Sequence, residues 1–175
     1  MNHVKNKARG TFPSLLGILA VFFSVVMFTA CGKNGEKTAD QVPDAPPASV
    51  VDLADVFTPE EEEMLASAIA QFERSSCGRI FVLTVHTTGD VPIETYSLRI
   101  ANDWKIATDE KSGVLLTFAI ADHRDRIEVS REWQDVLTNE RCAEILKSIV
   151  PELQAGRYAD ACTKAVRAME LHFPK

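Results

Sequence analysis

Two continuous apolar segments, separated by an amphipathic stretch, constrain the fold of this chain most strongly. Residues 79–85 (Arg-Ile-Phe-Val-Leu-Thr-Val) and 114–120 (Val-Leu-Leu-Thr-Phe-Ala-Ile) have the composition and length of buried strands. The stretch between them carries apolar residues at a helical period, namely Ile93, Tyr96, Ile100 and Trp104. A strand, a crossover helix and a second strand predict a parallel pair with a right-handed connection.

A helix start precedes the first of these strands. Thr58-Pro59-Glu60-Glu61 predicts a helix over 58–76, because Thr58 can cap, proline tolerates the first helical position and Glu61 completes a capping box. The acidic run from Glu60 to Glu63 lies where the helix dipole favours negative charge. We therefore interpret this run as a solvated helix start and not as a metal site.

The remaining elements follow the second strand. Residues 126–129 alternate in polarity like an edge strand that returns antiparallel after a turn at 122–125. Two more helices are expected, one from Thr138 to a stop at Pro151 and one over 158–172. The predicted fold class is α/β, with a small mixed β-sheet and helices on both faces, an α/β/α sandwich.

The N-terminus predicts export. Lys5, Lys7 and Arg9 precede an apolar run from Ser14 to Phe28, which is shorter than the roughly 20 residues of a comfortable membrane span. Phe28-Thr29-Ala30-Cys31 resembles a bacterial lipobox, so we expect residues 1–30 to be a signal peptide and Cys31 to be lipidated. An uncleaved signal anchor and ordinary secretion with cleavage near Ala30 are the alternatives.

This N-terminus sets the expected location and domain organisation. Residues 31–49 are polar and rich in proline, which predicts a flexible linker, and residues 50–175 are expected to form one domain. Two acyl chains would hold the protein firmly at a membrane. We expect a lipoprotein of the cell envelope on the periplasmic, extracytoplasmic side. Gly32 stands where aspartate retains some lipoproteins at the inner membrane, so the outer membrane is slightly favoured.

Charge and cysteines narrow the partners. The chain carries 19 basic and 25 acidic residues. Three basic residues precede Cys31, so 16 basic and 25 acidic remain, a net charge of −9 that disfavours nucleic acid. Cys77, Cys142 and Cys162 allow one disulfide in an oxidising compartment. Cys142 and Cys162 lie on apolar helical stripes and are expected in the core, and a bridge between them is left open.

Polar residues gather where strands of the predicted sheet end. Asp52, Asp122 and Asp125 should meet at the carboxyl edge of the parallel strands, where open α/β sheets bind ligands. Their carboxylates could hold Ca²⁺ or Mg²⁺, which prefer oxygen ligands. His86 and Arg124 would then contact a phosphate group. The competing interpretation is that these acidic loop residues cap helices or face water.

A second group of residues suggests a binding surface for another envelope protein. Arg131, Glu132 and Trp133 follow the edge strand, and Trp and Arg are enriched at contact hot spots. We expect Trp133 to be exposed and Trp104 to lie in the core.

An ordered set of short motifs identifies a family resemblance. These motifs are residues 51–56 before the Thr-Pro-Glu helix start, 80–85, 102–106 (Asn-Asp-Trp-Lys-Ile), 111–116 (Lys-Ser-Gly-Val-Leu-Leu) and 126–129 (Arg-Ile-Glu-Val). Together, over roughly residues 50–170, they resemble the TPM domain, named for a thylakoid lumen protein, a photosystem II repair protein and an acetylcholine-receptor modulator. The resemblance implies an exported α/β/α sandwich. Some members are described as acid phosphatases or divalent-cation binders, and others as accessory proteins.

The sequence is therefore compatible with two functions. The first is a membrane-anchored, non-catalytic binding or accessory module of the cell envelope; the second is a metal-dependent phosphomonoesterase of acid-phosphatase type. The chain has no Gly-x-Ser-x-Gly, Cys-x5-Arg or glycine-rich phosphate loop. The family's glycine-rich turn after Ile-Glu-Val is replaced here by residues 130–134. Both observations favour the first function.

Overall fold

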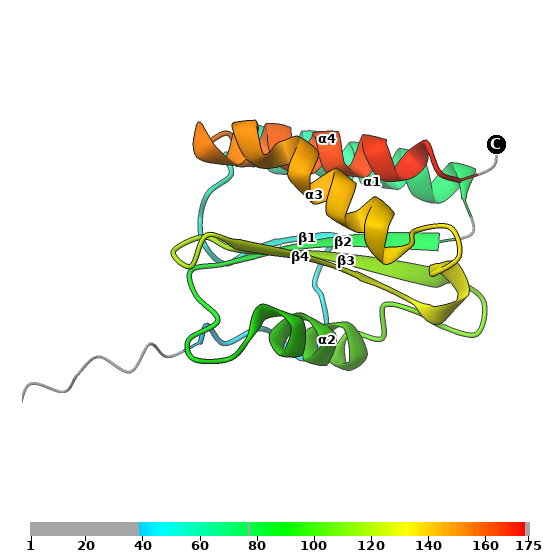
Figure 1. Cartoon of the computed structure of the whole chain (residues 1–175), viewed down its shortest axis with the longest axis horizontal. Coiled ribbons are helices and arrows are strands. Elements are labelled where there is room, and N and C mark those ends of the chain that lie inside the picture. Colours follow the sequence, from blue (N-terminus) through cyan, green and yellow to red (C-terminus); the bar gives the residue numbers. More distant parts are fainter. Residues whose placement is uncertain (1–38, 77, 174–175) are drawn as a thin grey trace, which may run out of the picture. The chain divides into compact units, whose positions relative to one another are not determined.

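The sheet of this protein is built around the two apolar strands, in the arrangement that their connection predicts. In the computed structural model, β2 (Gly78–Val85) and β3 (Ser112–Ala119) are parallel, and Phe81 lies opposite Leu115. The short strand β1 (Val50–Asp52) adds to β2 in parallel, and β4 (Arg124–Val129) pairs with β3 antiparallel. The strand order is β1-β2-β3-β4 (Figure 1), which confirms the predicted mixed sheet.

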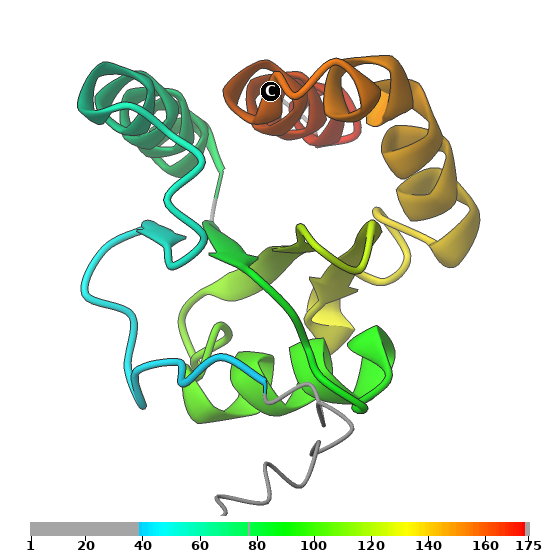
Figure 2. The same cartoon turned by 90° about the vertical axis from the view of Figure 1, so that its left-hand side faces the viewer.

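Helices cover both faces of this sheet. They are α1 (Pro59–Ser75), α2 (Ile93–Asp103), α3 (Asn139–Gln154) and α4 (Tyr158–Glu170), with the short 3₁₀ helix η1 (Arg131–Trp133) after β4. Helices α1, α3 and α4 lie on one face and α2 lies alone on the other (Figures 1 and 2). The α/β/α sandwich is confirmed.

The structure describes residues 39–76 and 78–173. The expected signal peptide 1–30, Cys31 with its lipid, and Cys77 all lie outside these residues. None of the helices within the described residues combines the length and the apolar character that a membrane crossing requires.

Local sequence explains where α1 begins. The Thr58 side chain accepts a hydrogen bond from the Glu61 amide at 3.3 Å, and the Glu61 carboxylate accepts one from the Thr58 amide at 2.8 Å. This is the predicted capping box. The apolar stripe Leu65, Ile69 and Phe72 is buried, and it fixes α1 on the sheet.

The sheet separates two hydrophobic clusters. The larger lies between the sheet and α1, α3 and α4, and includes both Cys142 and Cys162. The smaller lies between the sheet and α2, and includes Tyr96 and Trp104, as expected for Trp104. Both cysteines are free thiols, so the bridge left open between them is not formed. Burial raises the pKa of each thiol, which keeps it protonated and unreactive.

The prediction that Pro151 ends the third helix is wrong. Helix α3 continues through Pro151 to Gln154. A proline inside a helix costs about 3 kcal/mol. Ile149 is fully buried and Leu153 packs against the larger cluster, and burial of such side chains contributes about 1.5–3 kcal/mol each. Packing on both sides of the proline therefore outweighs its cost.

The segment expected to be a flexible linker is bound to the domain over part of its length. We call residues 39–43 the strap. The indole N–H of Trp104 donates to the Pro43 carbonyl at 2.7 Å, and the Tyr96 hydroxyl donates to the Asp40 carbonyl at 3.2 Å. Ala39 and Val42 pack against the smaller cluster. Composition did not indicate this, because the strap contributes only two small apolar side chains and is otherwise held by hydrogen bonds from Tyr96 and Trp104.

Candidate functional site

Asp52 ends β1 and organises the loop that leads into α1. Its carboxylate accepts hydrogen bonds from the amides of Val56 and Phe57, both at 2.8 Å. Its other oxygen accepts a short hydrogen bond from the hydroxyl of Thr84, which is fully buried in β2. The Asp52 oxygens therefore bind loop and strand groups of the protein itself, and Asp52 neither caps a helix nor only faces water.

Asp122 has a similar role in the turn between β3 and β4. Its carboxylate accepts from the Thr88 amide at 2.8 Å and from the Thr87 hydroxyl at 3.0 Å. Both threonines lie in the loop between β2 and α2, so Asp122 ties that loop to the β3–β4 turn. Thr88 is fully buried, and its hydroxyl also donates to the Val91 carbonyl at 2.8 Å.

The expected cation site is not assembled by these carboxylates. Asp52, Asp122 and Asp125 do lie near the carboxyl ends of the parallel strands, as predicted. Within residues 39–76 and 78–173, however, no three His, Cys, Asp or Glu side chains are grouped so that they could share a metal ion. The loops converge, but the Asp52 and Asp122 carboxylates point into backbone and threonine donors.

A cavity of about 610 Å³ opens beside this edge of the sheet. One wall is the end of β3 and the β3–β4 turn, and the other is the corner between α3 and α4. More of the wall is apolar than polar, as in many ligand pockets. Five of the larger lining side chains are those of Phe118, Ile120, Val150, Leu153 and Tyr158.

Three polar residues of the β3–β4 hairpin line the same cavity: His123, Arg124 and Asp125. Burial raises the pKa of the Asp125 carboxyl, since the charged form loses hydration there. Asp125 lies directly opposite Phe118 across the hairpin, which places this carboxyl next to an aromatic wall. His123 has a φ of 52°, so it occupies the left-handed position of the tight turn.

The two residues expected to contact phosphate do not line the same cavity. Arg124 lines the cavity, but His86 does not. His86 is exposed after β2, and its amide donates to the Asp40 carboxylate of the strap. Arg124 lies opposite Ala119 of β3, whose side chain packs in the smaller cluster on the α2 face.

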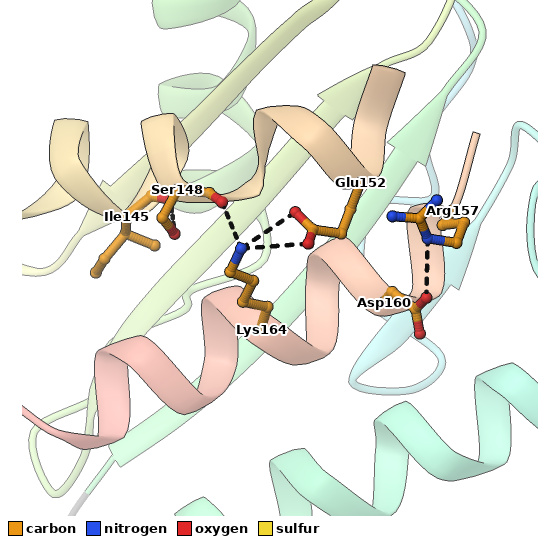
Figure 3. A network of polar contacts seen from close by, with 6 residues as sticks. All are labelled: Ile145, Ser148, Glu152, Arg157, Asp160 and Lys164. Carbon is orange, nitrogen blue, oxygen red and sulfur yellow. Dashed lines mark hydrogen bonds and ion pairs between the residues drawn. The ribbon is translucent and has the colours of Figure 1, made fainter. Parts of the chain in front are cut away.

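A network of charges holds the helical wall of the cavity (Figure 3). The Lys164 ammonium of α4 donates to the Ser148 carbonyl of α3 at 2.6 Å and to both oxygens of Glu152 at 3.2 Å. Arg157 pairs with Asp160 at 3.3 Å at the start of α4. The Lys164 contacts join α3 to α4, the two helices that carry the cavity residues Leu153 and Tyr158.

The expectation that Trp133 is an exposed partner-binding residue is wrong. Its side chain is only 9% exposed. It packs edge-to-face on Phe72 at 5.9 Å between ring centroids and lies 4.3 Å from the ring of Phe173. Gly78 is required beneath it, because a Cβ at Gly78 would overlap the indole ring. The η1 turn directs Trp133 inward, which the sequence pattern alone did not indicate.

The neighbours of Trp133 do lie at the surface. Arg131 and Glu132 are exposed and line a hollow of about 790 Å³, together with the end of α2. Leu98 of α2, which is 52% exposed, lies on the same hollow. Arg131 and Glu132 therefore remain available for a partner, without the tryptophan.

Comparison with known proteins agrees with this architecture. The model of the TPM domain family matches residues 50–171. Among solved structures, the N-terminal domain of a protein from P. gingivalis has a TM-score of 0.62 at 22% identity, covering 71% of this chain and 80% of that one. The BA42 protein of the psychrophilic bacterium Bizionia argentinensis has a TM-score of 0.57 at 24% identity, covering 67% and 84%.

A third similar structure is the N-terminal domain of the cg2496 protein from Corynebacterium glutamicum. Its TM-score is 0.59 at 13% identity, covering 77% of this chain and 86% of that one. At these identities the solved structures support the fold alone. No protein with a curated description matches this chain. The family match spans well over half of the sequence, and the chain belongs to the TPM domain family.

Proposed function

We propose that this protein is a lipid-anchored binding module of the cell envelope, which acts outside the cytoplasm by holding a ligand and not by chemistry of its own. The ligand would lie in the cavity between the β3–β4 hairpin and the α3–α4 corner. Its apolar part would contact Phe118, Val150 and Tyr158, and its polar part would reach Arg124 and Asp125. An apolar group of a small molecule or a side chain of a partner protein would fit this chemistry.

One observation carries the proposal: the carboxylates that a metal-dependent phosphomonoesterase would need are used to hold loops. Asp52 accepts hydrogen bonds from the amides of Val56 and Phe57, and Asp122 binds Thr87 and Thr88. These oxygens keep further lone pairs that could bind a cation, but no three His, Cys, Asp or Glu side chains are grouped around a common point within residues 39–76 and 78–173. Metal-assisted hydrolysis needs carboxylates directed at a common ion and an open position for water. An apolar cavity with a few polar groups serves binding better.

The anchoring part of the proposal rests on the N-terminal sequence. The basic start, the apolar run from Ser14 to Phe28 and Cys31 together support diacylation of that cysteine. Mass spectrometry of the protein from bacterial membranes should find a diacylglyceryl group on Cys31. The Cys31→Ser variant should keep its leader. An unmodified Cys31 in protein that carries no leader would overturn the lipid anchor.

The binding part is tested on the chain from Asn34 onward. Both hydrophobic clusters lie between residues 39 and 173, so this chain carries a complete core. Anilinonaphthalene sulfonate, an apolar fluorophore with one anionic group, is a suitable probe. We expect its fluorescence to rise on binding, and Val150→Gln to weaken that binding about tenfold, the loss expected for roughly one buried apolar group.

A matched control distinguishes binding of the probe in the cavity from non-specific binding to exposed apolar surface. Leu171 is 83% exposed and lies outside the cavity lining, so Leu171→Gln removes apolar surface elsewhere. This variant should bind the probe as the unmodified chain does. Equal loss in the two variants, or no binding to the unmodified chain, would contradict the proposed ligand site.

A further inference from the structure

Within the described residues no strand pairs with the outer edge of β4, although its central residue, Ile127, is only 4% exposed. In the order β1-β2-β3-β4, β4 is an edge strand. The Ser130 amide donates to the Gly113 carbonyl at 2.9 Å, and this bond extends the β3–β4 ladder by one pair. In an antiparallel ladder hydrogen-bonded pairs alternate, so Glu128 and Arg126 also face β3. The amides and carbonyls of Asp125, Ile127 and Val129 therefore point outward.

Space lies beside this edge. A hollow of about 340 Å³ is lined by residues 126–129 and by the start of α3. The hollow of about 790 Å³ on the α2 side also reaches Glu128 and Val129. One outward carbonyl, that of Val129, is contacted by the Gln134 side chain at 3.5 Å, a long and weak hydrogen bond. An added strand would replace this contact with a backbone hydrogen bond.

When β4 is paired antiparallel with β4 of a second copy, oppositely charged side chains of the two strands come to lie opposite each other. If Ile127 lies on the two-fold axis, Ile127 meets Ile127 of the second copy through outward backbone groups, and Asp125 meets Val129. Arg126 then stands opposite Glu128 of the second copy. These two form a pair without ladder hydrogen bonds, in which side chains approach most closely. Within one chain Arg126 and Glu128 already form an ion pair at 2.7 Å, so both lie on one face.

Charge favours this register over the two registers centred one residue away along β4. If the two-fold axis moves to Arg126, the two arginines face each other; if it moves to Glu128, the two glutamates do. Like charges directly opposite destabilise a strand pair. Charged side chains on an edge strand usually discourage pairing with another strand. In this register, however, the charges of Arg126 and Glu128 lie opposite charges of the other sign in the second copy.

We propose that two copies of this protein associate through their β4 strands, antiparallel and centred on Ile127, into one continuous sheet. The strand is short, so the dimer is weak in solution. Copies held on one membrane would meet at a raised effective concentration, a consequence that rests on the proposed lipid anchor. The association itself does not depend on the anchor, and its test uses the chain from Asn34 onward.

Charge reversal tests this pairing by mixing. In the Arg126→Glu dimer two acidic residues face each other across the interface, and in the Glu128→Arg dimer two basic residues do. Each variant alone should therefore dimerise about tenfold more weakly than the unmodified chain. A mixture of the two variants restores opposite charges across the interface and should dimerise like the unmodified chain. Both variants lose the same internal ion pair, so a change in folding alone would not be rescued by mixing.

Sedimentation equilibrium into the high micromolar range is the measurement. Lys147→Glu, an equal charge change at an exposed position on α3, is the control and should leave dimerisation unchanged. Dimerisation that weakens in each variant and returns in the mixture supports the proposal. An unmodified chain that stays monomeric throughout would overturn it, as would a dimer that is indifferent to both reversals or is not restored by mixing.

Discussion

The hydroxyl group of Thr84, near the end of β2, donates a hydrogen bond to the carboxylate of Asp52 at the end of β1. The same hydroxyl accepts a hydrogen bond from the Ala54 amide at 3.2 Å. Thr84 thus connects the two strands to the loop that Asp52 holds in place. A carboxylate in this position stabilises the start of α1, and its removal should be visible in folding before it is visible in any activity.

Replacement of Asp52 is therefore a test of stability. Asp52→Ala leaves the amides of Val56 and Phe57 without their acceptor, and we expect the free energy of unfolding to fall by about 3 kcal/mol. Asp52→Asn keeps one acceptor oxygen and should cost less. Urea unfolding measures both. Asp109→Ala, at an exposed loop position, is the matched control and should change stability by less than about 0.5 kcal/mol.

The packing of Trp133 on Gly78 leads to a second prediction. Trp133→Ala should destabilise the protein by about 3–5 kcal/mol, the range for removing a buried aromatic residue. Gly78→Ala should also destabilise it, because the added Cβ overlaps the indole ring. In the Gly78→Ala background, Trp133→Phe should cost less than it does alone. Additive free energies of unfolding in this double-mutant cycle would contradict the contact.

The strap makes a separate contribution. A chain that begins at Ser49 loses the hydrogen bond from Trp104 to Pro43 and the packing of Val42, so its free energy of unfolding should be lower by about 2 kcal/mol than that of the chain from Asn34. Trp104→Phe removes the indole donor. It should cost more in the longer chain than in the shorter one, and an equal cost in both would show that the strap does not use this bond.

Asp125 gives the stability a dependence on pH. Burial raises the pKa of this carboxyl above its ordinary value of 3.8, so the folded state favours the protonated form. Its contribution is greatest below the ordinary pKa and is lost as the pH rises through the higher pKa of the folded protein. Asp125→Asn should therefore stabilise the protein at neutral pH and have little effect at about pH 3. Thermal unfolding at the two pH values measures this. A lower unfolding temperature of Asp125→Asn at neutral pH would instead indicate that a cationic partner stabilises the Asp125 carboxylate.

The sequence predicted most of the fold because its signals were local and mutually consistent. The capping box at Thr58 and Glu61 and the apolar runs of β2 and β3 each specify one element, and their order specifies the sheet. Strand β1 has only three residues, too few to show a period, although it begins at Val50, where the domain was expected to begin. Pro151 was misjudged because its neighbours' burial depends on tertiary packing.

The candidate site was less predictable. The sequence brought Asp52, Asp122 and Asp125 to the correct edge of the sheet, because strand order determines where loops meet. It could not show where the carboxylates point, since their partners Thr84, Thr87 and Thr88 lie about thirty residues away in sequence. The wall of the cavity formed by Leu153 and Tyr158 comes from the helix corner, which only tertiary structure places opposite the β3–β4 hairpin.

Whether this domain binds a ligand without catalysing a reaction can be measured by the hydrolysis of a phosphate monoester. The chain from Asn34 onward is assayed on nitrophenyl phosphate in the presence of Ca²⁺, Mg²⁺ or a chelator, with Asp125→Asn as a variant that stays folded. We predict the same rate as in buffer alone under every condition, for both proteins. A turnover that the cation supports, and that the chelator and Asp125→Asn each abolish, would contradict it.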